Sequence, residues 1–153
     1  LFARESKDFL QKYFKKELFF TDVEGKTKDE VLKNLCWKVE QEKGLPETFT
    51  ASVLKREELT PTDYGNLVAL PHPERAFQER AFVAVAVLKE PIFWFRQKVQ
   101  VVFLTAIGRE EDENLQQFYE ATTDLILRPA DVQNLIRHPN YDRLIQLLRR
   151  AEE

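Results

Sequence analysis

His72 is one of two histidines in the chain, and its setting could support chemistry. It follows an apolar run at residues 67–70 and lies between Pro71 and Pro73, so its backbone is restrained on both sides. A loop at the end of a strand, held by a rigid framework, is where α/β folds present reactive groups. An unperturbed imidazole is largely uncharged at pH 7 and offers a nucleophilic nitrogen. A nucleophile fits this position, and so does a surface histidine in a proline-rich turn.

Two other basic side chains could take part in phosphate or proton chemistry. Arg56 lies near the end of an expected helix, and its guanidinium could bind two phosphate oxygens while staying charged. A solvated charge on a helix surface explains Arg56 equally simply. His138 precedes Pro139 at an expected turn between helices, where the helix dipole favours a histidine, so a structural role suffices for it.

The remaining candidates have simpler structural explanations. Cys36 lies on the apolar stripe of an expected helix and fits core packing. The acidic residues 110–113 fit the first turn of a helix capped by Asp112. Trp94, flanked by two phenylalanines, is typical of a core rather than of a ligand cage.

Composition excludes several function classes. The chain has 4 glycines, and they form no phosphate-cradling loop, while 2 distant histidines and 1 cysteine give no metal-ligand spacing. We therefore expect neither a cofactor nor a metal. The net charge of −3 argues against a nucleic-acid partner, and no apolar run approaches the roughly 20 residues of a membrane span. A single cysteine suits a reducing cytoplasm.

Helices and strands alternate along the chain, which predicts one α/β sandwich domain with a mixed sheet flanked by helices. The strands at 82–88 and 99–107 are apolar on both faces, as in a sheet covered on both sides. Thr27 and Gly44 mark the ends of one helix. Further helices are expected from Pro46 to about 58, from 112, from 129 and from about 140, with a helical lead-in over residues 5–16, a short strand at 17–20 and a strand at 67–70.

Residues 53–72 read Val-Leu-Lys-Arg-Glu-Glu-Leu-Thr-Pro-Thr-Asp-Tyr-Gly-Asn-Leu-Val-Ala-Leu-Pro-His. This stretch resembles the signature of the mannitol/fructose-type enzyme IIA family of the bacterial sugar phosphotransferase system (PTS). The signature combines an Arg-Glu pair, a Leu-Thr/Ser-x-Thr turn, a Gly, a strand and Ala-x-Pro-His. The spacing from Arg56 to His72 matches without a gap, and the resemblance extends over about residues 17–150.

The resemblance implies that His72 accepts phosphate from the phosphocarrier protein HPr and passes it to a IIB protein or domain, or holds it as a signal. By position, Arg56 would be the cation beside the phosphate and Thr62 a hydroxyl close to it. Phosphoryl transfer between two imidazoles asks the protein mainly for in-line positioning and charge stabilisation. The resemblance therefore implies a phosphoryl-transfer domain with a regulatory rather than a metabolic role.

Two departures from the transport members of the family bear on whether the domain serves transport or regulation. Asn114 stands where those members often carry a second histidine, and Pro73 stands where they commonly have Gly. Asn114 argues against a transport role. The Pro-His-Pro sequence and the stretches at 89–94 and 99–104 resemble the C-terminal IIA-like domain of BglG-type antiterminators and related regulators with PTS regulation domains. We therefore expect residues 1–16 to lead in from N-terminal regulatory domains of the same chain, and residues 17–153 to form the IIA domain. A IIA component of a sugar uptake system, or a IIA-like scaffold without phosphate, remains an alternative.

Overall fold

The computed structural model describes residues 9–150, and its centre is a five-stranded sheet in the order β1-β4-β5-β3-β2. The strands are β1 (Phe14–Phe20), β2 (Asp63–Gly65), β3 (Val68–Ala69), β4 (Phe82–Phe93) and β5 (Lys98–Ala106). β1 runs parallel to β4 and β3 parallel to β5, whereas the β4–β5 and β2–β3 pairs are antiparallel. The sheet is therefore mixed, as predicted.

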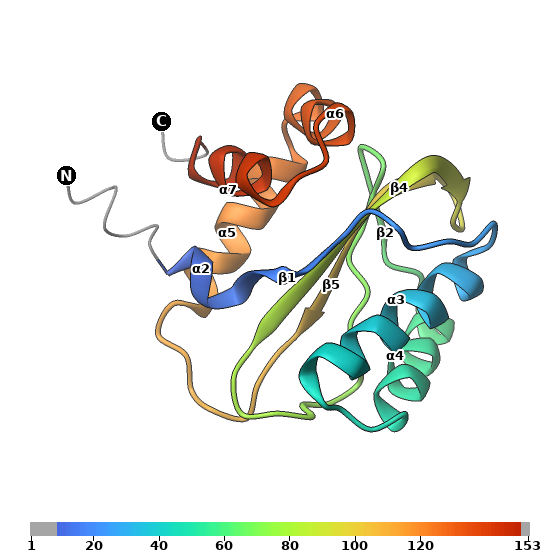
Figure 1. Cartoon of the computed structure of the whole chain (residues 1–153), viewed down its shortest axis with the longest axis vertical. Helices are drawn as coiled ribbons and strands as arrows, with labels where there is room; N and C mark the ends of the chain where they lie inside the picture. The colour runs from blue at the N-terminus through green and yellow to red at the C-terminus, as the bar shows by residue number, and fades with distance from the viewer. Residues whose placement is uncertain (1–8, 151–153) are drawn as a thin grey trace.

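Helices cover both faces of this sheet (Figure 1). α3 (Lys28–Lys43) and α4 (Thr48–Leu59) lie on one face, and α2 (Leu10–Tyr13), α5 (Leu115–Ile126), α6 (Pro129–Arg137) and α7 (Tyr141–Arg150) lie on the other. The valines of β4 at 83, 85 and 87 belong to the core under α5–α7, and the alanines at 84 and 86 belong to the core under α3 and α4. The two-sided apolarity of β4 is thus confirmed. No helix among residues 9–150 is both long enough and apolar enough to cross a bilayer.

Both ends of α3 follow the local sequence signals. The Thr27 side chain accepts a hydrogen bond from the Glu30 N–H at 3.2 Å, as an N-cap should. Gly44 ends the helix in the left-handed conformation, with φ of 65°. A residue without Cβ adopts this conformation at little cost. Both capping predictions are confirmed.

The N-terminal region differs from the expected helix over residues 5–16. Residues 1–8 lie outside the described part of the chain, α2 ends at Tyr13, and β1 begins at Phe14, three residues before the expected strand. Phe14 pairs with Val83 of β4 and is buried. Leu10 and Phe14 are four residues apart, a spacing typical of a helix, and this spacing led to the prediction. The pairing of Phe14 with β4, which local spacing does not reveal, starts the strand instead.

The apolar run before His72 forms a shorter strand than predicted. Asn66 and Leu67 both have positive φ, 53° and 68°, and make a two-residue turn between β2 and β3. Leu67 is an unusual residue for this conformation, which costs it about 1–2 kcal/mol. Neighbours hold the turn: the Asn66 side chain donates to the Ile126 carbonyl at 2.7 Å, and the Leu67 carbonyl accepts from Val101 at 3.0 Å.

Two loops at the carboxyl end of β5 lie in backbone contact. A Cβ added to Gly108 would lie 2.2 Å from the Glu79 carbonyl oxygen, so only glycine permits this approach. The Arg109 N–H donates to the Gln78 carbonyl at 3.1 Å, and the Gln78 side chain donates to the Ala106 and Ile107 carbonyls at 3.3 and 3.2 Å. The segment that follows His72 is thereby joined to the segment that leads into α5.

Candidate functional site

His72 lies three residues beyond Ala69, the last residue of β3. The Pro71 carbonyl accepts the Thr105 N–H at 3.0 Å, so the chain still follows β5 up to that point. The imidazole is half-buried, and its Nδ1 lies 3.3 Å from the Leu70 carbonyl oxygen. A carbonyl can only accept, so Nδ1 carries the proton in this hydrogen bond. The lone pair of the neutral ring is therefore on Nε2.

α4 contacts the segment that follows His72. The Glu74 N–H donates to the Ser52 hydroxyl at 2.7 Å, and Ser52 is buried. Ser52 and Arg56 are four residues apart on α4 and share one face of the helix. Arg56 is half-buried and donates to the Thr60 carbonyl at 2.9 Å; within residues 9–150 it forms no hydrogen bond with His72. Arg56 thus follows the Ser52 contact by one helical turn, and its guanidinium binds the Thr60 carbonyl just beyond the end of α4.

Glu57 is the glutamate of the Arg-Glu pair in the signature, and the sequence analysis gave it no role of its own. Its carboxylate is 2% exposed and accepts from the Thr62 N–H and hydroxyl, both at 2.7 Å, and from the Trp94 indole N–H at 3.0 Å. Lys28 Nζ lies 3.9 Å away. A signal was present: Glu57 follows the buried Val53 by one helical turn, so it had to lie on the buried face of α4.

Thr62 therefore uses its hydroxyl proton within the protein. Because this proton is donated to Glu57, a hydrogen bond from Thr62 to a phosphate would require the Glu57 bond to open. The expected phosphate contact of Thr62 stays a prediction. The observed contacts make Thr62 the link between α4 and the strand pair that leads to His72.

Asn114 is the residue immediately before α5. Its N–H donates to Asp112 Oδ1 at 3.0 Å, and its side chain forms no cap hydrogen bond. The prediction that Asp112 caps this helix is wrong, because α5 begins at Leu115 and the carboxylate binds a backbone N–H that precedes it. The acidic residues 110–113 likewise precede the first turn instead of lying in it.

Asn114 also borders a hollow of about 610 Å³ at this end of the sheet. Its lining includes Tyr13 and both basic and acidic side chains, but not His72. Burial raises the pKa of Tyr13 above its ordinary value, and the nearby Asp112 carboxylate adds to the shift. The hollow is thus next to the position of the second family histidine and separate from His72.

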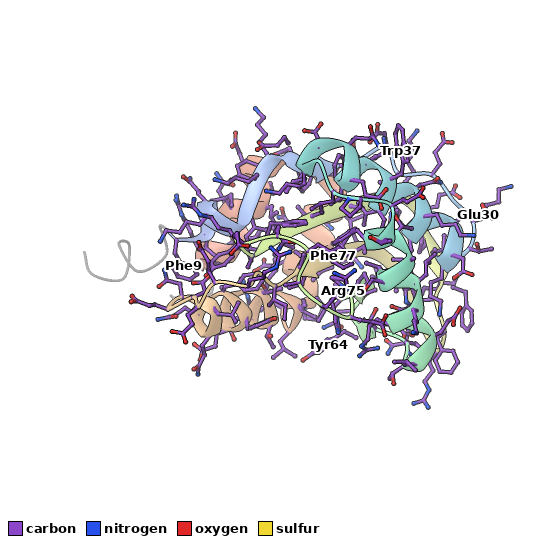
Figure 2. All side chains as sticks on the ribbon, turned by 90° about the horizontal axis from the view of Figure 1, so that it is seen from below. Phe9, Glu30, Trp37, Tyr64, Arg75 and Phe77 are labelled. Carbon is purple, nitrogen blue, oxygen red and sulfur yellow. The ribbon has the colours of Figure 1, made fainter. Side chains whose placement is uncertain are left out.

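A second guanidinium lies on the segment that follows His72. Arg75 stacks over the ring of Phe77, with 3.9 Å between the guanidinium carbon and the ring centroid (Figure 2). Phe77 in turn packs edge-on against Phe49 of α4, at 5.5 Å between centroids. The sequence analysis did not single out Arg75, because neither its type nor its spacing distinguishes it from other surface arginines.

The other candidate residues lie where a structural role predicts. Cys36 is fully buried on α3, and burial raises the pKa of its thiol to about 12. Trp94 is buried in the core under α3 and α4. His138 is exposed at the C-terminal end of α6.

Residues 12–151 match the family described as phosphoenolpyruvate-dependent sugar phosphotransferase system, EIIA 2. The chain belongs to this family. The match covers the strand–turn–histidine arrangement described above and nearly all of the sheet. The resemblance expected from residues 53–72 is therefore confirmed.

Two curated relatives of this EIIA 2 domain are regulators of Bacillus subtilis (strain 168). It is 36% identical over 140 residues to the "Probable licABCH operon regulator", which covers 92% of this chain and 22% of that protein. It is 27% identical over 123 residues to "Transcriptional regulator ManR", covering 80% of this chain and 19% of that protein. The chain thus spans about a fifth of the length of these relatives.

Solved structures share the fold of this EIIA 2 domain. The nitrogen regulatory protein IIA-Ntr from Neisseria meningitidis superposes with a TM-score of 0.75 at 18% identity, covering 92% of this chain and 99% of that one. Enzyme IIAMTL of Escherichia coli, solved in complex with phosphorylated enzyme IIBMTL, gives a TM-score of 0.72 at 18% identity, covering 88% and 97%. The predicted mannitol-type α/β sandwich is confirmed.

Proposed function

We propose that this domain carries a phosphoryl group on Nε2 of His72. The observation that supports the proposal most is the hydrogen bond between Nδ1 and the Leu70 carbonyl. It fixes the proton on one ring nitrogen and leaves the other as the nucleophile. Pro71 and Pro73 restrain the backbone around the ring, so the nucleophile is presented in one direction.

The transfer needs no cofactor. Nε2 of His72 attacks the phosphorus of a donor phosphohistidine, the new N–P bond forms as the donor N–P bond breaks, and the donor imidazole leaves with the electron pair. The Nδ1 proton stays in its hydrogen bond with Leu70, so the ring that receives the phosphoryl group remains oriented. Arg56 would offset the charge of the arriving group, with hydrogen bonds of about 1.5–3 kcal/mol.

The role we propose is regulatory. Both curated relatives named above are regulators, and the more similar one is 36% identical. The donor would be phospho-HPr or a IIB protein or domain in the cytoplasm, and the phosphate would alter N-terminal regulatory domains of the same chain. Asn114 in place of a second histidine favours this role over a transport component. The division into a lead-in over residues 1–16 and a IIA domain over 17–153 stays a prediction.

The test is phosphorylation in a reconstituted system of phosphoenolpyruvate, enzyme I and HPr, followed by intact-mass spectrometry at neutral to alkaline pH. We expect one added phosphoryl group on the wild type and on His138→Gln, and none on His72→Gln. His138→Gln is the matched control because it removes the other histidine from an exposed position. Label on His72→Gln, or none on the wild type, would refute the proposed site.

The transport alternative makes a different prediction for the next acceptor. An uptake component passes its phosphate onward to a IIB partner as fast as it receives it, whereas a sensor that is phosphorylated by HPr retains it. Mixing the phosphorylated domain with IIB proteins of the same genome and following loss of the phosphate over time separates the two. Rapid, complete transfer to a IIB protein of an uptake system would favour transport.

A further inference from the structure

Glu57 joins two separate parts of the structure through one buried carboxylate. Its Oε2 accepts the Thr62 N–H at 2.7 Å and the Trp94 indole N–H at 3.0 Å, and its Oε1 accepts the Thr62 hydroxyl at 2.7 Å. A buried carboxylate is stable only when donors replace its lost hydration, and these three donors do so. Because they come from different segments, the carboxylate fixes those segments relative to α4.

The hydrogen bonds continue from Thr62 to the imidazole. The Thr62 carbonyl accepts the Leu70 N–H at 3.0 Å, and the Leu70 carbonyl lies 3.3 Å from His72 Nδ1. Glu57 therefore fixes Thr62, Thr62 fixes Leu70, and Leu70 holds the Nδ1 proton. Only residues 62 and 70 separate the buried carboxylate from the ring.

We propose that Glu57 is a positioning residue that sets the tautomer and the direction of His72 through Thr62 and Leu70. The proposal rests on the proposed function of His72, and it adds a residue that does not contact the phosphate. No proton moves along the chain of hydrogen bonds. Each donor keeps its proton, and the carboxylate acts by holding the Leu70 carbonyl where Nδ1–H can reach it.

The turn between β4 and β5 is the second segment held by Glu57. Trp94 is 4% exposed, whereas its neighbours Phe93 and Phe95 are 63% and 49% exposed. Among the hydrogen bonds described for Glu57, the one from the Trp94 indole N–H is the one that comes from this turn. Removing the indole N–H leaves both bonds from Thr62 intact, so a change at Trp94 should affect stability without affecting the His72 ring.

The two carboxylate oxygens of Glu57 accept from different kinds of donor, so variants of Glu57 can separate their contributions. Oε2 accepts from two N–H groups that cannot reverse, whereas Oε1 accepts from a hydroxyl that can rotate and accept instead. Glu57→Gln, with its oxygen at the Oε2 position, can keep all three contacts. Glu57→Met has a similar length but no acceptor, and Glu57→Asp withdraws the acceptor by one carbon–carbon bond.

The experiment reads the ring directly, by ¹⁵N-¹H NMR of the His72 nitrogens in the unphosphorylated domain below its unfolding temperature. Wild type, Glu57→Gln and Trp94→Phe should show the Nδ1–H tautomer. Glu57→Met and Glu57→Asp should show a mixture of tautomers, and phosphoryl transfer from phospho-HPr should be about 10- to 100-fold slower. Glu58→Gln, an exposed change on the same helix, should match the wild type in both measurements.

Trp94→Phe separates positioning from general stability. It should lower the unfolding temperature while leaving the tautomer unchanged. If Trp94→Phe and Glu57→Met lower the unfolding temperature alike and both keep the Nδ1–H tautomer, Glu57 has only a structural role and the proposal fails. If Glu57→Met does not fold, Glu57→Asp decides in the same way. Because the tautomer is read without phosphate, this result is independent of whether His72 accepts a phosphoryl group.

Discussion

The segment around His72 and the segment around Asn114 lie at the same end of the sheet but are held very differently. His72 is fixed by its own Nδ1, by Ser52 through Glu74, and by the Glu57–Thr62 contacts. Asn114 is fixed by its backbone: its N–H donates to Asp112 and its carbonyl accepts the Phe118 N–H, while its side chain makes no cap hydrogen bond. Of the two positions that carry histidines in transport members of the family, position 72 is thus held by a hydrogen bond of its own side chain and position 114 by those of its backbone.

This difference agrees with the proposal that His72, and not position 114, carries the phosphoryl group. A nucleophile must be held in one protonation state and one direction, and only the His72 segment has contacts suited to that. The Asn114 segment keeps its place in the fold through the backbone contact at Gly108. The place of Asn114 in the fold is therefore kept without a cap hydrogen bond from its side chain.

The largest effect is expected from breaking the contact that joins the two segments. Gly108→Ala would place a methyl group 2.2 Å from the Glu79 carbonyl oxygen, so the loops must separate. We expect a loss of about 2–4 kcal/mol in the free energy of unfolding. Urea denaturation of the whole chain measures it.

Gly44→Ala is the control for this substitution. Its φ is +65°, but no atom lies within 4 Å of the added Cβ, so it tests backbone strain without a clash. We expect a loss of about 1 kcal/mol. An equal or larger loss for Gly44→Ala would mean that the approach at Gly108 is not a tight one.

A smaller effect is expected from removing the charge of Arg56 on α4. Arg56→Gln keeps a donor for the Thr60 carbonyl but removes the charge that would offset the phosphoryl group. We expect transfer from phospho-HPr to slow by about 100-fold, with little change in unfolding free energy. Lys55→Gln, an exposed neighbour, should leave the rate unchanged. A normal rate for Arg56→Gln would direct attention to Arg75.

The smallest effect is expected at Asn114. Asn114→Ala should change the transfer rate by less than about 3-fold, because its side chain makes no cap hydrogen bond and, among the hydrogen bonds described for residues 9–150, none to the His72 segment. Asn114→His in a His72→Gln background should take no phosphate, since nothing there fixes one ring nitrogen as a donor. A phosphorylated double variant would show that the two positions are less different than their contacts indicate.

Features set by neighbouring residues could be predicted from the sequence. Thr27 and Gly44 cap α3 as their residue types predict. The alternating valines and alanines of β4 predict a sheet covered on both faces, as observed. Each depends on a backbone preference or a periodicity within one element. His72 stood out because two prolines flank it.

Features set by distant residues could not be predicted. The start of β1 at Phe14 depends on pairing with Val83, and that pairing overrides a helical spacing. The hydrogen bond from the Trp94 indole to Glu57 joins residues that are 37 positions apart. The positive φ of Leu67 is held by β5 and by contacts of the adjacent Asn66 with α5. A local pattern shows such a residue only where its type does not fit its position, as with the Glu57 carboxylate on the buried face of α4.

The most direct test of the account is to identify the phosphorylated nitrogen in the wild-type domain. Phosphorylation by phospho-HPr, followed by ³¹P and ¹⁵N NMR of the histidine ring, distinguishes the two phosphohistidine isomers. The hydrogen bond from Nδ1 to the Leu70 carbonyl predicts a single isomer, with phosphorus bonded to Nε2 of His72. Phosphorus on Nδ1, or on any residue other than His72, would contradict it.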